Sequence, residues 1–233
     1  MAVNAQAVIG AMIRALEEPP HEARHPCRPV ITLSRSTASR GDAIAHALAD
    51  RLGLKCYDRE ILDRIAAEAG VSSTLVERLT EKLDAVDSWM YSAVFGKRLT
   101  RTEYLRFLTT MIRGLYHTGG VIVGRGAHVI LADREILKVR IVGSLQACAS
   151  RLAAQEGISV SEAERRVQES NAHREKFMWE VFQSRYDDAS AFDLIVNTDQ
   201  FPSDDGVVDI IVTALRGRGL GEDTPQAAAP RRR

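Results

Sequence analysis

The chain has 233 residues, 45% of them hydrophobic, and its 31 basic side chains are balanced by 31 acidic ones. This length suits one domain with appendages, and the apolar fraction is ample for one buried core. A net charge of zero indicates neither a nucleic-acid partner nor an anionic membrane surface. The chain also lacks the run of about 18 apolar residues that a membrane span requires.

The N-terminus and the cysteines favour a cytoplasmic protein. Residues 1–18 have the spacing of a short amphipathic helix and lack the apolar centre of a signal peptide. Cys27, Cys56 and Cys148 are scattered at no metal-ligand spacing, which is typical of free thiols in a reducing compartment. The six histidines show no paired spacing either, so we expect surface or core positions for them.

Five short apolar runs alternate with helical patterns. This alternation predicts a parallel sheet covered on both faces, a three-layer α/β/α fold whose ligands lie at the carboxyl ends of the strands. A capping-box signal, Ser161 followed by Glu164, marks the start of a long polar helix. The strands are expected at 30–34, 54–58, 121–124, 137–143 and 192–198, and the helices at 43–53, 59–70, 72–84, 102–117, 126–134, 145–157, 158–182 and 204–219.

The first expected strand leads through a polar loop into a helix, which is the layout of a phosphate-binding loop. A standard loop reads G-x-x-x-x-G-K-[ST], and this chain has neither the lysine nor the hydroxyl at those positions. Arg35 and Arg40 can carry phosphate charge through bidentate contacts. The alternative is an ordinary strand-to-helix connection whose polar residues cap the helix. The candidate phosphate-binding residues are Ser34, Arg35, Ser36, Thr37, Ser39, Arg40 and Gly41.

Several stretches, taken in order, resemble the cytidylate-kinase-like family, relatives of the nucleoside monophosphate kinases. They are ITLSR…SRGDAIAHALADRLGLKCYDREIL, VIVGRGAHVIL, KVRIVGSLQACASRL, SEAERRV…HREKF and FDLIVNT, within roughly residues 30–215. The resemblance implies a P-loop kinase domain at 29–218, with a helical insert at 72–118 and a lid at 157–190. Residues 1–28 are then an N-terminal helix and linker, and 219–233 a disordered tail. Family members usually carry a glycine-rich loop after the first strand, whereas Gly41 is the only glycine here.

By this resemblance, the acceptor nucleotide is held by Arg125 between Gly124 and Gly126, with Asp58 and Arg151 also on the acceptor side. Arg174 is a basic lid residue that covers the phosphates. Arg40, Arg174 and Asp58 are therefore the candidate catalytic residues. Each has a simpler alternative: Arg125 as a surface arginine paired with Asp133 or Glu135, Asp58 as a helix N-cap, and the lid arginines as a solvated helix face.

The resemblance implies a phosphotransferase that uses ATP and Mg²⁺ to phosphorylate CMP or a related small acceptor. Mg²⁺ ligands near the loop would come from Ser39, Asp42 or Asp58. A second hypothesis is a nucleotide-binding pseudo-kinase without turnover, because the loop has lost its lysine, hydroxyl and glycines. A third is an interaction protein that uses the aromatic residues of the insert, which would also suit a homodimer.

Overall fold

Five strands form one parallel sheet in the order β2-β3-β1-β4-β5. This sheet belongs to a computed structural model that describes residues 28–58 and 101–220. The predicted five-stranded parallel sheet is confirmed, and β1 lies at its centre, where the strand order reverses. The strands are β1 Val30–Arg35, β2 Cys56–Tyr57, β3 Gly120–Val123, β4 Leu137–Val142 and β5 Leu194–Asn197.

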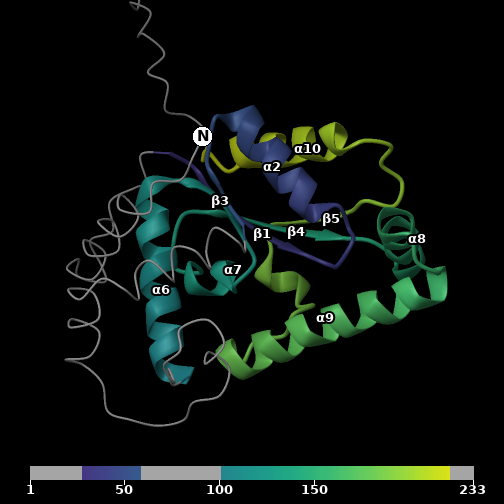
Figure 1. Cartoon of the computed structure of the whole chain (residues 1–233). Coiled ribbons are helices and arrows are strands. Elements are labelled where there is room, and N and C mark those ends of the chain that lie inside the picture. Colours follow the sequence, from purple (N-terminus) through teal and green to yellow (C-terminus); the bar gives the residue numbers. More distant parts are fainter. Residues whose placement is uncertain (1–27, 59–100, 221–233) are drawn as a thin grey trace, which may run out of the picture.

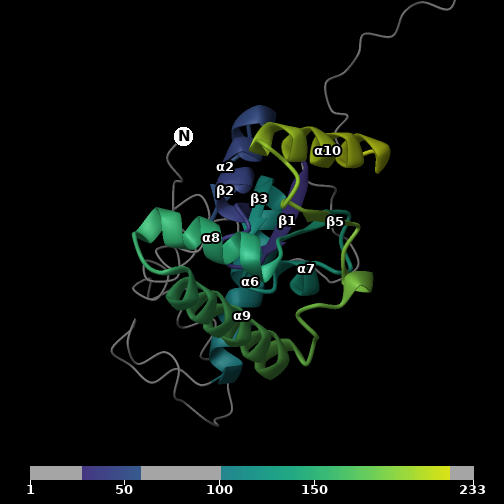
Figure 2. The same ribbon diagram turned by 90° about the vertical axis from the view of Figure 1, so that its right-hand side faces the viewer.

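Helices cover both faces of the sheet and complete the predicted three-layer α/β/α fold. Figure 1 shows α2 and α10 above the sheet and α6, α7 and α9 below it, and the turned view in Figure 2 keeps the same layers. The described helices are α2 Gly41–Leu52, α6 Arg101–Thr118, α7 Ala127–Ile130, α8 Leu145–Glu156, α9 Val160–Phe182, the short 3₁₀ helix η1 Ala189–Ala191 and α10 Asp204–Gly217.

The first half of the central strand is mostly apolar because both faces of the strand are buried. Val30 packs in the cluster formed with α6 and α7, whereas Ile31 and Leu33 pack in the cluster formed with α2 and α10. Alternate side chains of a strand point to opposite faces, so a continuous apolar run serves two cores. Burial of each such side chain contributes about 1.5–3 kcal/mol, which fixes β1 and therefore the loop that follows it.

Two helix boundaries test the sequence signals directly. Gly53 ends α2 in a left-handed conformation with φ of 62°, as expected for a glycine stop. The capping box assigned to Ser161 and Glu164 is wrong, because Ser159 is the N-cap of α9 and accepts a hydrogen bond from the Glu162 amide. The same S-x-x-E spacing occurs two residues earlier, and there it suits the buried positions Ala163 and Val167 of the helix.

Other predicted elements lie outside the described residues. These are the helix at 1–18 with its linker, the helix at 59–70, the tail beyond 220 and the first part of the insert at 72–118. The last part of the insert is α6, so the helix predicted at 102–117 is confirmed. Within 28–58 and 101–220, no helix is long and apolar enough to cross a membrane.

Candidate functional site

The loop between β1 and α2 has left-handed residues although it lacks the glycines of a standard phosphate-binding loop. In the spacing G-x-x-x-x-G-K-[ST], Arg35 and Arg40 take the glycine positions, Gly41 the lysine position and Asp42 the hydroxyl position. Ala38 and Arg40 nevertheless have φ of 57° and 65°, in the left-handed region. Non-glycine residues adopt this conformation at a cost of roughly 1–2 kcal/mol each, so the surrounding structure holds the loop in this shape.

Hydrogen bonds inside the loop explain how this shape is held. The Ser36 amide donates to Ile141 O of β4 at 3.0 Å. The Ser39 side chain is fully buried, and its hydroxyl lies 2.9 Å from Ser36 O and 3.3 Å from Ile141 O. The predicted ligands Ser36 and Ser39 thus anchor the loop to β4, and the Ser39 hydroxyl points into the protein.

Arg35 fills the space that glycines usually leave open in such loops. Its guanidinium forms an ion pair with Asp42, with Nη2 2.8 Å from Oδ1. A Cβ added to Gly124 would lie 2.8 Å from Arg35 Nη1, and one added to Gly41 would lie 2.4 Å from Arg35 Cβ. The side chain of Arg35 therefore crosses the loop and is packed between two glycines.

A cavity of about 310 Å³ lies between the carboxyl ends of β1 and β3 and helix α9. Arg35, Arg125 and Arg174 line it, and none of its described lining residues is an aspartate or glutamate. Phe177 and Met178 give it an apolar side. Of the predicted site residues, the structure brings together Ser34, Arg35, Gly124, Arg125, Gly126 and Arg174.

Burial makes the positive charge of Arg174 in the cavity more costly. Burial lowers the pKa of the Arg174 guanidinium, and the nearby charge of Arg35 lowers it further. Arginine stays charged under these conditions because its ordinary pKa exceeds 12. Two like charges held close together in a partly dry cavity favour an anion between them.

Three consecutive residues after β3, at one end of the cavity, have a left-handed backbone conformation. Gly124, Arg125 and Gly126 have φ of 75°, 54° and 67°. A Cβ added to Gly126 would lie 2.2 Å from the Phe182 ring, so this position requires glycine for its conformation and for its packing. The turn directs Arg125 into the cavity lining from the end of β3.

Helix α9 closes the cavity by contacting the loop. The Thr37 amide donates to Asn171 Oδ1, and the Thr37 hydroxyl donates to Ser170 Oγ, both at 2.9 Å. Arg174 Nη1 donates to Arg35 O at 3.1 Å. One backbone donor of the phosphate loop is therefore already taken by an amide oxygen of the predicted lid.

Further basic residues of α9 lie on its solvated face. Arg165 pairs with Glu162 and Glu169, Arg166 pairs with Glu156 and Glu162, and Lys176 pairs with Glu180. Their side chains are exposed, and hydrogen bonds from both arginines lower the pKa of Glu162 to about 2. These are the helix-face pairs that the simpler interpretation predicted.

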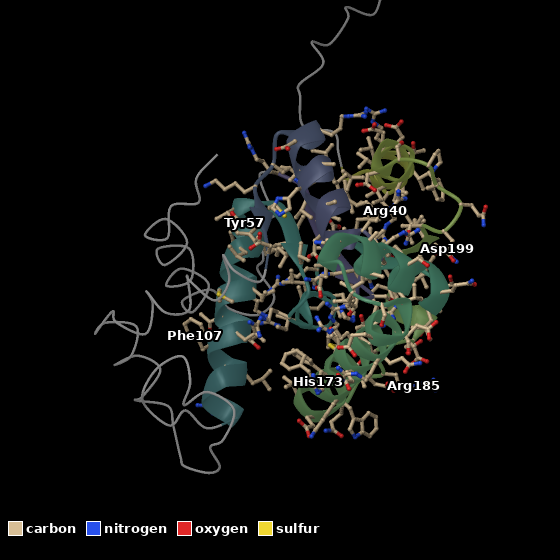
Figure 3. All side chains as sticks on the ribbon, turned by 45° about the vertical axis from the view of Figure 1, so that its right-hand side comes forward. Arg40, Tyr57, Phe107, His173, Arg185 and Asp199 are labelled. Carbon is tan, nitrogen blue, oxygen red and sulfur yellow. The ribbon has the colours of Figure 1, made fainter. Side chains whose placement is uncertain are left out.

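Arg40 and Arg151 lie apart from the cavity, at the β5 end of the sheet. Arg40 Nη2 donates to Phe201 O at 3.0 Å and to Thr198 O at 3.4 Å. Arg151 donates to Thr198 Oγ1 and Thr198 O, both at 3.1 Å. Figure 3 shows Arg40 and Asp199 beside α10, far from His173 on α9. Both guanidinium groups satisfy carbonyls of the turn between β5 and α10, which draws them away from Arg125 and Arg174.

Asp58 also lies outside the cavity lining. It follows β2, and its carboxylate is 3.3 Å from His46 Nε2 on α2. The helix that it was predicted to cap begins at residue 59, outside the described residues. Among the residues that the structure describes, no three His, Cys, Asp or Glu side chains gather into a metal site.

The structure adds two residues to this region that the sequence did not single out. Tyr186 lines the cavity, and its hydroxyl donates to Arg35 O at 2.5 Å. His128 also lines it, is 6% exposed and stacks on Phe192 with ring centroids 4.7 Å apart. Burial, with Arg140 and Lys138 nearby, lowers the pKa of His128 from 6.5 to about 4. Tyr186 lies outside the stretches that carry the family resemblance, and His128 lies within VIVGRGAHVIL, where no spacing set it apart from its neighbours.

The sequence profile of the cytidylate kinase-like family matches residues 30–200. This chain belongs to that family. The cytidylate kinase of Methanothrix thermoacetophila is similar, with 30% identity over 193 residues, which covers 80% of this chain and 98% of that protein. The cytidylate kinase of Methanopyrus kandleri is 28% identical over 177 residues, or 76% of this chain and 88% of that protein.

A solved structure supports the fold. The crystal structure of an uncharacterized protein from Eubacterium ventriosum has a TM-score of 0.59 to this chain at 19% identity. The match covers 81% of this chain and 99% of the other. At this identity the likeness concerns the architecture alone, and the family assignment rests on the sequence matches.

Proposed function

We propose that the chain transfers a phosphoryl group from ATP to CMP or a related small phosphorylated acceptor. The observation that carries the proposal is the cavity in which Arg35, Arg125 and Arg174 meet without an acidic side chain among the described lining residues. Phosphoryl transfer requires positioning and positive charge around the moving group. Membership of the family and the names of the two similar proteins support the same reaction class.

The acceptor side of the site follows from the β3 turn. Arg125 lies at the end of β3 between two left-handed glycines, where its guanidinium can bind the phosphate of a nucleoside monophosphate. Phe177 and Met178 give the rest of the acceptor an apolar wall. Arg174, which contacts the loop and the cavity at once, is suited to the phosphoryl group in transfer.

The donor side depends on the loop backbone. The N-terminus of α2 and the left-handed residues Ala38 and Arg40 are suited to an anion. Mg²⁺ neutralises phosphate charge in such reactions, and one or two carboxylates usually suffice to hold it. Asp42 fits that role because its side chain is 60% exposed, whereas the Ser39 hydroxyl is buried and bonded. The Arg35–Asp42 ion pair would have to open for the ion to bind.

Arg40, Arg151 and Asp58 receive revised roles within this proposal. Arg40 and Arg151 hold the turn after β5 against the loop, and Asp58 pairs with His46. Arg35 then supplies the charge that the absent lysine would bring, because its guanidinium is the loop cation that reaches the cavity.

A nucleotide-binding pseudo-kinase is the second candidate, and one observation favours it. Asn171 already accepts the Thr37 amide, so a phosphate would have to displace the lid helix from that donor. The interaction role of the insert, the homodimer and the cytoplasmic location remain predictions from the sequence.

A thermal-shift panel of nucleoside mono-, di- and triphosphates, with and without Mg²⁺, tests the proposal. A ligand at a hundred times its dissociation constant stabilises the fold by about 2.7 kcal/mol. We expect shifts with both CMP and ATP, loss of the CMP shift in Arg125→Gln, and a normal shift in the exposed control Arg165→Gln.

The outcomes separate the candidates. Shifts with ATP and CMP together with ADP release in a coupled assay support the kinase. A shift with CMP alone and no ADP release supports the pseudo-kinase. The absence of a shift with every triphosphate overturns phosphoryl transfer from ATP.

A further inference from the structure

We infer that Tyr186 is a positioning residue that sets Arg35 and the first turn of the phosphate loop at the cavity. The residue lies in the turn between α9 and η1 and lines the cavity opposite β3. The inference rests on the proposed function in one respect, that the cavity binds a phosphate anion.

Two side chains converge on one carbonyl at the end of β1. The Tyr186 hydroxyl donates to Arg35 O at 2.5 Å, and Arg174 Nη1 donates to the same oxygen at 3.1 Å. Arg35 is the last residue of β1, so this carbonyl marks the point where the sheet ends and the loop begins. Because the carbonyl and the side chain belong to one residue, fixing the peptide also limits where the guanidinium can point.

The ring of Tyr186 packs against a buried cation, the guanidinium of Arg140. Arg140 of β4 is 6% exposed, and its guanidinium lies 4.2 Å from the centroid of the Tyr186 ring. It also donates to Tyr186 O and lies 5.5 Å from the centroid of Phe192. A desolvated cation is attracted more strongly to an aromatic face than an exposed one. Arg140 and Tyr186 together form a rigid connection from the sheet to the loop.

The arrangement favours a positioning role over a purely structural one. The hydrogen bond of Tyr186 ends at the residue whose guanidinium lines the cavity, and it shares its acceptor with Arg174. Without the hydroxyl, Arg174 is the only one of these two donors left on that carbonyl. We therefore expect the guanidinium groups of Arg35 and Arg174 to move more freely relative to each other, while the two hydrophobic cores stay packed.

Tyr186→Phe is the direct test, because it removes the hydroxyl and keeps the ring that stacks on Arg140. Tyr57→Phe is the matched control: its buried hydroxyl lies 3.1 Å from Thr118 Oγ1, and Tyr57 does not line the cavity. Binding of inorganic pyrophosphate is measured by calorimetry, and amide hydrogen exchange is followed in the loop. Loss of one strong hydrogen bond is expected to weaken pyrophosphate binding about tenfold in Tyr186→Phe and not in the control.

Arg140→Lys provides a second variant, since it keeps the charge and loses the planar group over the ring. We expect the same direction of change in pyrophosphate affinity and faster exchange at the loop amides in both variants. Wild-type affinity and wild-type loop exchange in Tyr186→Phe, with a loss of thermal stability like that of the control, would overturn the inference. If the unmodified protein binds neither pyrophosphate nor nucleotides, the proposed function fails, and the exchange measurement still decides whether Tyr186 fixes the loop.

Discussion

The two sides of the phosphate loop use arginine in opposite ways. On the β3 side, Arg125 and Arg174 line a cavity without described acidic neighbours in its wall. On the β5 side, Arg40 and Arg151 are bound to the carbonyl of Thr198. Figure 3 shows the separation, with Arg40 and Asp199 beside α10 and His173 on α9.

The two pairs of arginines differ in which part of the chain their side chains contact: Arg40 and Arg151 contact the turn after β5, whereas Arg174 contacts Arg35 O beside the cavity. The turn between β5 and α10 offers the carbonyls of Thr198 and Phe201, and the first residue of α10 offers the carboxylate of Asp204, 3.3 Å from Arg40 Nε. A guanidinium beside such acceptors stabilises the fold, because burying those groups without a partner is costly. Arg125 and Arg174 instead line a cavity whose described wall contains no carboxylate, and a guanidinium there is suited to bind an anionic ligand.

The strongest test of the comparison is Arg174→Gln. We expect kcat/KM to fall about 100- to 1,000-fold, the loss typical for one preorganised donor at a transition state. Arg165→Gln on the same helix is the control, since Arg165 only pairs with glutamates on the exposed face. Steady-state kinetics with ADP detection measures both variants, and an equal loss in the two would contradict the distinction drawn here.

On the β5 side, we expect the loss of an arginine to lower the stability of the fold. Arg40→Ala removes two charged hydrogen bonds and leaves Asp204 without its partner, so we expect a loss of roughly 3 kcal/mol in the free energy of unfolding. Arg40→Gly should recover about 1 kcal/mol of this loss, because glycine adopts φ of 65° without strain. Urea unfolding measures both, and a greater stability of the alanine variant would refute this account of the loop.

On the cavity side, His128 is expected to make the free energy of unfolding depend on pH. Its pKa is about 4 in the fold against 6.5 ordinarily, because of burial and the nearby charges of Arg140 and Lys138. Between these values the unfolded chain binds a proton that the folded chain does not, so the free energy of unfolding decreases as the pH falls from 6.5 to 4.

We expect His128 to contribute roughly 2–3 kcal/mol to this decrease, which His128→Phe should remove while the ring still stacks on Phe192. Urea unfolding at pH 7 and pH 4 measures the difference. His46→Phe is the control, because its side chain is 52% exposed. An unchanged pH dependence in His128→Phe would show that other groups cause it.

The smallest effect is expected at the contact between the lid and the loop. Asn171→Ala frees the Thr37 amide, which should strengthen pyrophosphate binding about threefold if that donor is available to phosphate. Ser170→Ala is the companion variant, because it breaks the neighbouring contact to the Thr37 hydroxyl and leaves the amide bonded. Calorimetry distinguishes the two, and weaker binding in Asn171→Ala would instead make Asn171 part of the binding site.

The sequence predicted the parallel sheet, and it also placed Arg125 directly after the third strand, where the structure has it in the cavity lining. The apolar run at 121–124 predicts a buried strand, which is β3 in the structure. Arg125 directly follows that run, so the sequence predicts its position at the carboxyl end of the strand. Gly53 likewise ended α2 as a glycine stop should. These predictions succeeded because each depended on local pattern or on the end of a strand.

The direction of side chains over longer distances could not be predicted. Arg40 is adjacent to the loop position that usually holds lysine, yet its partners are Thr198 and Phe201, about 160 residues further along the chain. Tyr186 lies in an irregular turn whose path depends on the packing of α9. The start of α9 was misplaced because two S-x-x-E spacings overlap there, and burial of Ala163 and Val167 selects between them.

The close contact between Arg35 and Gly41 limits which substitutions the loop can accept. Any side chain at position 41 would begin 2.4 Å from Arg35 Cβ, so lysine cannot enter there while arginine stands at 35. Because the contact is with a Cβ atom, only glycine at 35 removes it. A redesign toward the ordinary loop therefore needs Arg35→Gly before Gly41→Lys.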